Sequence, residues 1–384
     1  MRETITIAGS LAQRPRVGGH TWVFLQYLLG FRRLGWDVHF VDRLEPGTEK
    51  GAGVDYLASV MERVGLGDRW TLLYDGGREV YGVDRAEAVS RARRSAFLLN
   101  VMGFLDDADL LAAAPRRVFL DIDPGFGQLW RDLGLHDLFA GHDDHVTIGE
   151  NIGRPGCLIP TCGLDWITTK QPVVLDEWPV AGEAGEAAEA AEAAGGRITS
   201  VCSWRGPFGP IEHHGTTYGL RVHEFRRFLE LPSLTGETFE LALDIDDADA
   251  ADLDRLRANG WGVVDPSVVA SDPWRYRGYV QQSAAELCVA KQLYVATGSG
   301  WFSDRSACYL ASGRPVVAQD TGLAGLVPAG DGLLTFGTLD EAVAAVEAVR
   351  SDPVRHGRAA REVAEAHFSS DVVLPKLLAA LGVS

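Results

Sequence analysis

The strand–helix–strand pattern that opens the chain constrains its fold more than any other feature. Residues 4–8 form a short β-branched run, residues 21–34 are apolar almost all round, and residues 36–41 are apolar again. A helix that is apolar on all sides is buried, here against a sheet. Gly35 supplies the helix stop, and two strands joined in this way are parallel with a right-handed connection. The pattern therefore predicts an α/β fold.

The same alternation runs through the rest of the chain. Short apolar runs predict strands at 96–101, 117–121, 145–148 and 157–160, then at 197–203, 240–245, 262–265, 293–297 and 314–318, with closing helices at 340–350 and 353–367. A chain of 384 residues is too long for one ordinary core, so two domains are expected. The sequence thus predicts two Rossmann-like, doubly wound α/β domains.

A low-complexity segment marks the junction between them. Residues 181–196 read AGEAGEAAEAAEAAGG, without one large apolar side chain. Such a segment is typical of a flexible junction, and equally of an exposed loop beside one. We expect an N-terminal domain at 1–170, a junction at 171–196, a second domain at 197–368 and a last helix within 369–384.

Composition and charge exclude some classes of protein. A net charge of −17 disfavours nucleic-acid binding, which needs clustered Lys and Arg. No run approaches the ~20 apolar residues of a membrane span, and the first residues enter a strand without a secretion leader. Five cysteines, an odd number scattered through apolar contexts, indicate reduced thiols and a cytoplasmic protein. The sequence carries no indication of the oligomeric state.

The most informative motif spans residues 298–317. A turn of small residues precedes a helix that opens with hydroxyls and an arginine, and Gly-Arg-Pro-Val-Val follows. A helix N-terminus presents free N–H groups and a positive dipole end, which suits a diphosphate. Serine hydroxyls and an arginine add further donors. The candidate phosphate-binding residues are Ser299, Gly300, Ser303, Asp304, Arg305 and Ser306.

This motif resembles the nucleotide-sugar half of GT-B glycosyltransferases, in which a glycine-rich turn, a phosphate-binding helix and Gly-x-Pro-Val-Val occur in that order. The resemblance implies the GT-B fold, with two Rossmann-like domains facing a central cleft and a last helix that crosses back to the first domain. It also implies a nucleotide-diphosphate-sugar as co-substrate, with no further cofactor. The donor sugar's hydroxyls would lie at Asp320, Thr321 and Gly322.

The motif departs from two subgroups of that family. Many retaining members carry two glutamates eight residues apart, where this chain has Gly300 and Cys308. Many inverting members that act on small molecules open the turn with a histidine, which is also absent. The resemblance therefore implies the fold and the donor more directly than the stereochemistry.

A second motif lies in the loop after the first strand. In inverting GT-B enzymes a Gly-His pair at the start of the first helix provides the general base, and here Gly18, Gly19 and His20 match it. A helix N-terminus disfavours imidazolium and helps to keep a neutral base. The resemblance implies that a carboxylate after a later strand, Asp121 or Asp123, orients the ring. Alternatively, the glycines form a tight turn and the histidine bonds locally.

Other candidates follow from the same resemblance. Arg205, after the first strand of the second domain, would bind phosphate, with Arg221 as a weaker candidate. Trp274 or Tyr276 would stack on the nucleotide base, unless these aromatics anchor their loop to the core.

We expect no metal. GT-B catalysis generally relies on a helix dipole and arginine instead. The Asp-x-Asp pairs at 121–123 and 244–246 and the His-Asp-Asp-His run at 142–145 are therefore interpreted as structural or solvated.

The sequence therefore predicts a bacterial glycosyltransferase that transfers a sugar from a nucleotide-diphosphate-sugar to a small-molecule acceptor. We expect inversion, with His20 as base, in natural-product or glycoconjugate biosynthesis. Three alternatives stay open: a retaining GT-B transferase, a GT-B-fold sugar-nucleotide epimerase, and a non-catalytic transferase-like partner protein.

Overall fold

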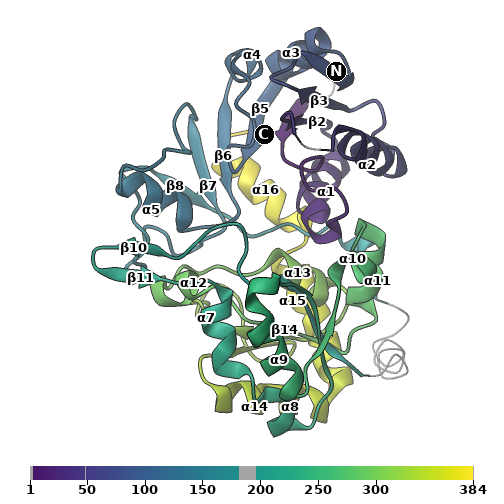
Figure 1. The fold of residues 1–384 in the computed structure, drawn as a ribbon. Helices are drawn as coiled ribbons and strands as arrows, with labels where there is room; N and C mark the ends of the chain where they lie inside the picture. Colours follow the sequence, from purple (N-terminus) through teal and green to yellow (C-terminus); the bar gives the residue numbers. More distant parts are fainter. Residues whose placement is uncertain (1–2, 48, 181–195, 384) are drawn as a thin grey trace.

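The computed structural model describes residues 3–47, 49–180 and 196–383, and contains two α/β units, one above the other in Figure 1. The low-complexity run expected at the junction lies outside the described residues, apart from Gly196. Within the described part of the chain, no helix combines the length and the apolar character that crossing a bilayer requires.

The first unit is an eight-stranded sheet in the order β4-β3-β2-β1-β5-β6-β7-β8, parallel except between β3 and β4. Its strands are β1 (Thr4–Ala8), β2 (Asp37–Leu44), β3 (Trp70–Tyr74), β4 (Glu79–Gly82), β5 (Ser95–Val101), β6 (Arg117–Asp121), β7 (Asp144–Thr147) and β8 (Trp166–Thr168). Its helices are α1 (Gly18–Arg33), α2 (Lys50–Arg63), α3 (Arg85–Arg94), α4 (Ala108–Ala113) and α5 (Phe126–Asp132).

The second unit is a six-stranded parallel sheet in the order β13-β12-β9-β14-β15-β16. Its strands are β9 (Ile198–Ser203), β12 (Phe239–Asp244), β13 (Gly262–Val264), β14 (Ala285–Cys288), β15 (Val316–Gln319) and β16 (Leu333–Phe336), with a separate hairpin of β10 (Ile211–His213) and β11 (Thr216–Tyr218). Its helices are α7 (Arg221–Phe225), α8 (Leu231–Thr235), α9 (Ala250–Ala258), α10 (Pro266–Val269), α11 (Pro273–Gln281), α12 (Gln292–Thr297), α13 (Asp304–Ala311), α14 (Leu339–Ser351), α15 (Pro353–His367) and α16 (Ser370–Ala380).

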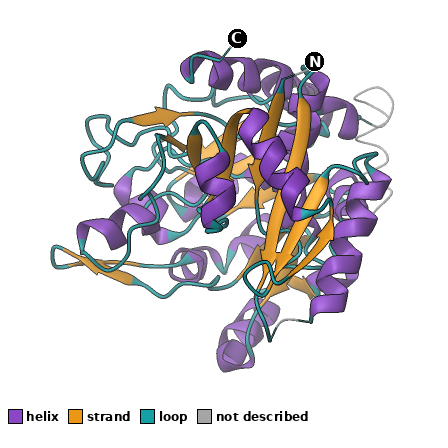
Figure 2. Cartoon of the chain, turned by 90° about the horizontal axis from the view of Figure 1, so that it is seen from above, coloured by secondary structure: helices purple, strands orange, loops and turns teal. Residues whose placement is uncertain are grey.

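Both sheets reverse their winding direction beside their first strand, between β1 and β5 and between β9 and β14. Ligands of open α/β sheets bind at such switch points, outside the carboxyl ends of the strands. Figure 2, which looks down on the molecule, shows helices on both sides of the strands. Most buried apolar side chains form one cluster that runs through both units.

Two expected strands are wrong. Residues 157–160 contain no strand, and there the Leu158 N–H donates to the Thr297 carbonyl of the second unit. Residues 293–297 belong to helix α12, which ends at Gly298 in a left-handed conformation. A short apolar run fits a strand and a buried helix equally well, and the strand lies instead at β14.

Helix α16, at the end of the chain, packs on α1 of the first unit (Figure 1). Gly30 of α1 makes this approach possible, because a Cβ there would lie 2.5 Å from Leu374 Cδ1 and 3.1 Å from Ser370 Cβ. Arg33 of α1 also pairs with Asp371, at 3.4 Å.

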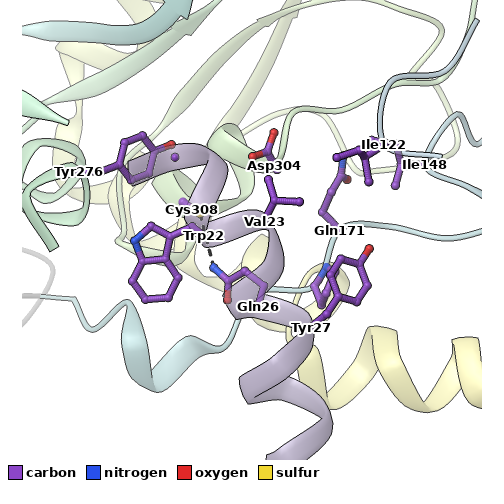
Figure 3. Close-up of a pocket in the computed structure, with 12 residues that line it drawn as sticks. Trp22, Val23, Gln26, Tyr27, Ile122, Ile148, Gln171, Tyr276, Asp304 and Cys308 are labelled. Atoms are coloured by element: carbon purple, nitrogen blue, oxygen red, sulfur yellow. Dashed lines mark hydrogen bonds between the residues drawn. The ribbon is translucent and has the colours of Figure 1, made fainter. Parts of the chain in front are cut away.

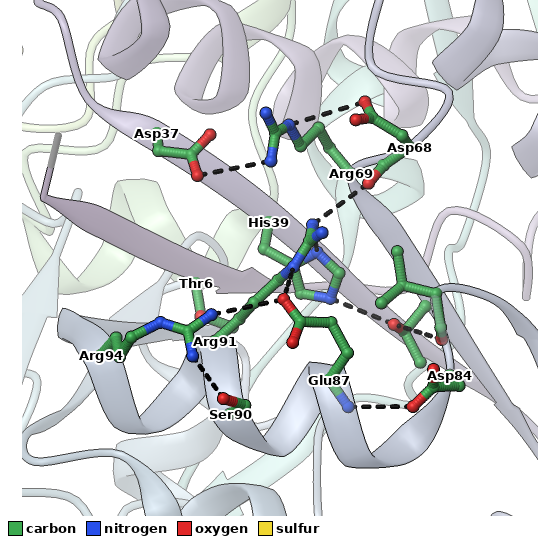
Figure 4. Close-up of polar contacts among 12 residues, drawn as sticks. Thr6, Asp37, His39, Asp68, Arg69, Asp84, Glu87, Ser90, Arg91 and Arg94 are labelled. Atoms are coloured by element: carbon green, nitrogen blue, oxygen red, sulfur yellow. Dashed lines mark hydrogen bonds and ion pairs between the residues drawn. The ribbon is translucent and has the colours of Figure 1, made fainter. Parts of the chain in front are cut away.

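A polar network fixes α3 against the first sheet (Figure 4). Buried His39 lies between Thr71 Oγ1, at 3.1 Å from Nε2, and Arg91 Nη1, at 3.2 Å from Nδ1. Burial and the nearby arginines lower the pKa of His39 to about 3, so the ring is neutral. Glu87 in turn accepts a hydrogen bond from Arg91 Nε at 2.9 Å. None of these side chains lines the cleft between the two units.

Candidate active site

A cleft of about 530 Å³ lies between the two units, at both switch points. The end of the loop after β1 and the first residues of α1 line it from the first unit, within residues 14–20. The ends of β9 and β12, helix α10 with its two flanking residues and the start of α13 line it from the second. The two walls meet closely: the Gly18 N–H donates to the Ala270 carbonyl at 2.8 Å, and a Cβ at Gly18 would lie 2.3 Å from the Asp272 carbonyl oxygen. Gly18 therefore permits the contact between the units.

Gly19 and His20 line the cleft one residue further along. His20 Nε2 lies 3.1 Å from the Ser10 carbonyl oxygen and 3.0 Å from Ser10 Oγ. Because a carbonyl only accepts, this contact assigns the ring proton to Nε2 and leaves the lone pair on Nδ1. Burial, with the Arg14 guanidinium nearby, lowers the pKa of His20 to about 4. The ring is therefore a neutral base at pH 7.

The expectation that Asp121 or Asp123 orients His20 is wrong in this structure. Asp121 accepts hydrogen bonds from Gln128 Nε2 at 2.7 Å and Thr147 Oγ1 at 2.9 Å, and burial raises its pKa to about 6. Asp123 instead reaches into the second unit, where Lys291 Nζ lies 2.6 and 2.7 Å from its oxygens and the Tyr294 hydroxyl donates to it. Asp121 ends β6 and Asp123 follows it, but the partners of both lie elsewhere.

The N-terminus of α13 opens onto the cleft, as the motif predicts. Ser303 caps the helix by accepting the Arg305 N–H, and Asp304 and Arg305 line the cavity. Burial raises the pKa of Asp304. Ser306 is fully buried, and within the described structure its Oγ has no hydrogen-bond partner. It therefore lies beneath the cleft surface.

The guanidinium of Arg305 is bonded to other residues of the protein. Its Nε pairs with Glu286 of β14, which is 0% exposed, Nη1 donates to the Val201 carbonyl at 2.9 Å, and Nη2 lies 3.2 Å from Cys288 Sγ. Each of the three nitrogens has a protein partner, so Arg305, expected as a free phosphate ligand, is held in a buried ion pair at the cleft wall. Proximity to the carboxylate raises the pKa of Arg305 further.

The glycine-rich turn before α13 contacts the first unit. Asn151 Nδ2 donates to the carbonyls of Gly298, at 3.0 Å, and Gly322, at 2.8 Å, and its backbone N–H donates to the Ser299 carbonyl. Gly300 adopts φ +70°, and a Cβ there would lie 2.8 Å from the Asn151 nitrogen. This turn is thus part of the interface between the units, and Ser299, Gly300 and Gly322 do not line the cleft.

The residues expected to hold the donor sugar form a turn of their own. Asp320 Oδ1 accepts the N–H groups of Gly322 and Leu323 at 2.9 Å each. Thr321 donates its hydroxyl to the Trp301 carbonyl at 2.6 Å. Their contribution to sugar binding stays a prediction.

Two further expectations are corrected, namely phosphate binding by Arg205 and base stacking by Trp274. Arg205 forms a bidentate pair with Asp249, at 2.6 Å for both bonds, and lines a neighbouring surface hollow rather than the cleft. Trp274 packs under the guanidinium of Arg63, 3.6 Å from its ring centroid, and so joins α11 to α2. Tyr276, its alternative, does line the cleft, although its side chain is buried.

Besides Arg305, three arginines line the cleft. Arg14 and Arg16 are exposed on the loop of the first unit, and Arg16 holds a left-handed φ of +65°. Arg221, the weaker sequence candidate, begins α7 and donates from Nε to the Val289 carbonyl and from Nη1 to the Ser203 carbonyl. The first two stand beside the Gly-Gly-His motif, yet nothing local to the sequence indicates that they face the second unit.

A small apolar cavity of about 40 Å³ lies beside the cleft, between α1 and α13 (Figure 3). Val23 and Tyr27 of α1 line it on one side, and Asp304 and Cys308 of α13 on the other. Gly19, Tyr276 and Asp304 line both spaces. Asp304 therefore stands where the cleft meets this cavity.

No known family profile matches the sequence, and no curated protein matches it. Solved structures do match. An α-glucosyltransferase in complex with UDP is 11% identical, with a TM-score of 0.61 and 100% of both chains covered. HepE of Anabaena, in complex with UDP-glucose, is 12% identical, with a TM-score of 0.60 and 99% of both chains covered.

Sucrose-phosphate synthase of Thermosynechococcus elongatus is also 12% identical, with a TM-score of 0.55 and 99% of both chains covered. An α-glucosyltransferase has further been solved with UDP and a 13-mer DNA. At these identities the likeness shows the fold. The chain has the GT-B fold of these glycosyltransferases, two Rossmann-like α/β domains on either side of a cleft, which confirms the fold predicted from its sequence.

Proposed function

We propose that this chain is a glycosyltransferase that transfers a sugar from a UDP-sugar to a small-molecule acceptor. The observation that carries the proposal is the cleft itself. It lies at the switch points of both sheets, with the N-terminus of α13 on one wall and a neutral histidine on the other. The structural neighbours solved with UDP or UDP-glucose support the choice of donor.

The diphosphate is proposed to lie between the first turn of α13 and the arginines of the cleft. The free N–H groups of a helix start favour an anion. Arg221 approaches from the second unit and Arg14 and Arg16 from the first, so that charge from both walls compensates the leaving group. Asp304, at the meeting point of the cleft and the apolar cavity, is proposed to bond a sugar hydroxyl.

The proposed reaction is a single displacement with inversion. His20 Nδ1 accepts the proton of an acceptor hydroxyl while that oxygen attacks the anomeric carbon, and UDP leaves toward the arginines. The Ser10 carbonyl, rather than a carboxylate, holds the imidazole in its tautomer. An anionic diphosphate nearby offsets the effect of Arg14 and raises the basicity of the ring.

The acceptor is proposed to be a small molecule rather than a nucleic acid. The net charge of −17 repels a polyanion. A DNA acceptor would also need a basic surface beyond the cleft.

Calorimetry with UDP tests the donor site. Replacing Arg221 with Ala should weaken UDP binding by about 1.5–3 kcal/mol, the range for a hydrogen bond to a charged group. The matched control is Arg257→Ala, which removes an exposed arginine on α9 outside the cleft. If both variants bind UDP as the parent does, the diphosphate does not lie against Arg221.

Product analysis separates the alternatives. With an acceptor present, NMR of the product's anomeric proton distinguishes inversion from retention. Isomerisation of UDP-sugar without an acceptor would identify an epimerase. Absence of UDP binding by the parent would favour a non-catalytic partner protein.

A further inference from the structure

A second site lies away from the cleft, where the β10–β11 hairpin of the second domain meets α5 of the first (Figure 1). His213 Nε2 lies 2.7 Å from Asp132 Oδ2, and His214 Nε2 lies 3.8 Å from the same oxygen. One ligand atom from each of the three residues falls within 4.8 Å of the others. Two imidazoles from one domain thus converge on one carboxylate from the other.

We propose that Asp132, His213 and His214 bind a divalent transition-metal ion of the zinc class, which clamps the two domains together. Imidazole nitrogen and carboxylate oxygen are preferred ligands of such ions, at about 2.0–2.2 Å. A tetrahedral ion with bonds of that length separates its ligands by about 3.4 Å. The two nitrogen–oxygen distances in the cluster bracket that value, so small side-chain rotations admit the ion.

The local structure favours a cation at this point. Asp132 is the last residue of α5, and the carbonyl groups at a helix C-terminus disfavour a carboxylate unless a cation compensates it. His214 adopts a left-handed φ of +48°, uncommon for a residue with a side chain. In this conformation its ring lies edge-on to that of His213, with centroids 4.0 Å apart, and approaches the same carboxylate.

The three proposed ligands are buried to different extents, which allows a metal ion to exchange with solvent. The side chain of His213 is 8% exposed, so the protein holds its ring in place. The side chain of His214 is 81% exposed and that of Asp132 is 35% exposed. An ion can therefore enter from solvent and keep water as its fourth ligand.

The ion would strengthen a contact that already joins the domains. Phe208, just before the hairpin, packs between Phe126 and Trp130 of α5, with ring centroids 5.1 and 4.9 Å away. Metal binding at the tip of the hairpin would hold this apolar contact closed. The inference is independent of the proposed sugar transfer.

Titration of the full-length chain with Co²⁺, after removal of any affinity tag, tests the site. We expect one Co²⁺ per chain with visible d–d absorption, displaced by Zn²⁺. His214→Ala and Asp132→Asn should each weaken Co²⁺ binding by more than about 100-fold, because even outer-shell changes cost 10–100-fold. His136→Ala, which removes an exposed imidazole near α5, should bind as the parent does.

Thermal unfolding gives a second readout that does not depend on absorption. Zn²⁺ should raise the Tm of the parent and of His136→Ala, and leave that of His214→Ala unchanged. Two results would overturn the proposal. One is equal Co²⁺ binding by the parent and His214→Ala. The other is a parent that binds no Co²⁺ while Asp132→Asn still lowers Tm, which would reduce the cluster to a hydrogen-bonded contact.

Discussion

At the scale of the residue, Arg305 shows how one side chain can suit two roles. Its place in the first turn of α13 indicates a phosphate ligand, and the structure pairs it with Glu286 of the neighbouring strand instead. The two residues are 9% and 0% exposed, so neither charge has water as an alternative partner. Removal of either one leaves the other charge buried.

Replacing Arg305 with Ala should therefore destabilise the protein by about 3–5 kcal/mol, the cost of breaking a buried pair from one side. Denaturant unfolding measures this loss. The double variant Arg305→Met with Glu286→Leu should recover most of the stability, because an apolar replacement of a buried pair is often neutral. UDP affinity of the double variant close to that of the parent would exclude Arg305 from phosphate binding, whereas loss of UDP binding by a stable double variant would restore that role.

The proposed base makes a prediction about pH. The folded-state pKa of His20 is about 4, below the ordinary 6.5, so the ring stays neutral as the pH falls until about 4. The acid limb of kcat/KM, which reports the free enzyme, should thus lie near pH 4, and His20→Ala should lower turnover by about 10²–10⁴ and lack that limb. A pH–rate profile of the parent and the variant measures both effects, and turnover of His20→Ala near that of the parent would exclude the role.

The lowered pKa of His20 also affects the stability of the folded protein. Below pH 6.5 His20 is protonated in the unfolded chain but stays neutral in the folded chain. The free energy of unfolding therefore decreases as the pH falls from 6.5 to about 4. His20→Ala should lack this contribution, which urea unfolding at a series of pH values would detect.

At the scale of the element, the turn before α13 serves the interface rather than the ligand. Gly300 has a left-handed φ and lies against Asn151 of the first domain, while Gly325 has a similar φ of +78° with open space around it. A Cβ added at Gly325 would therefore cause backbone strain alone, whereas a Cβ added at Gly300 would cause the same strain and a clash with its neighbours.

Gly325→Ala should cost about 1–2 kcal/mol, the strain of a left-handed residue with a Cβ. Gly300→Ala should cost a further ~1–3 kcal/mol, because the new methyl group displaces the loop at Asn151. Chemical unfolding of both variants gives the difference. Equal losses would show that the turn does not pack tightly against the first domain.

At the scale of the whole molecule, the two domains share one apolar core, and the last helix crosses from the second domain to the first. Helix α16 follows the second domain in the chain and covers α1 of the first. Trp22 of α1 packs 4.9 Å from Trp178 and donates its indole N–H to the Pro273 carbonyl of α11. We therefore expect the domains to unfold together.

Leu374→Ala in α16 tests this expectation. Leu374 is 0% exposed, so the variant should lose about 2–5 kcal/mol, while Leu135→Ala, at a 68% exposed position, should change stability by less than about 0.5 kcal/mol. Tryptophan fluorescence and circular dichroism should report one coincident transition. Two separate transitions, with only one shifted by Leu374→Ala, would show that the domains unfold independently.

The sequence by itself determined the α/β class, the two doubly wound sheets and the loops that reach the cleft. These features depend on local periodicity, on glycine stops and on the rule that ligands bind beyond the carboxyl ends of parallel strands. His20 and the start of α13 were predicted for this reason, since His20 follows the glycine pair after the first strand and α13 follows a turn of small residues.

Only the tertiary structure decided which partner each charged residue meets. Asp123 pairs with Lys291, 168 residues away, and Asn151 bonds a carbonyl 171 residues away. No local pattern encodes such pairs, because the packing of the two domains brings them together. The same packing placed Arg14 and Arg16 in the cleft and paired Arg305 with Glu286 there, since a side chain's role follows from the groups that fold around it.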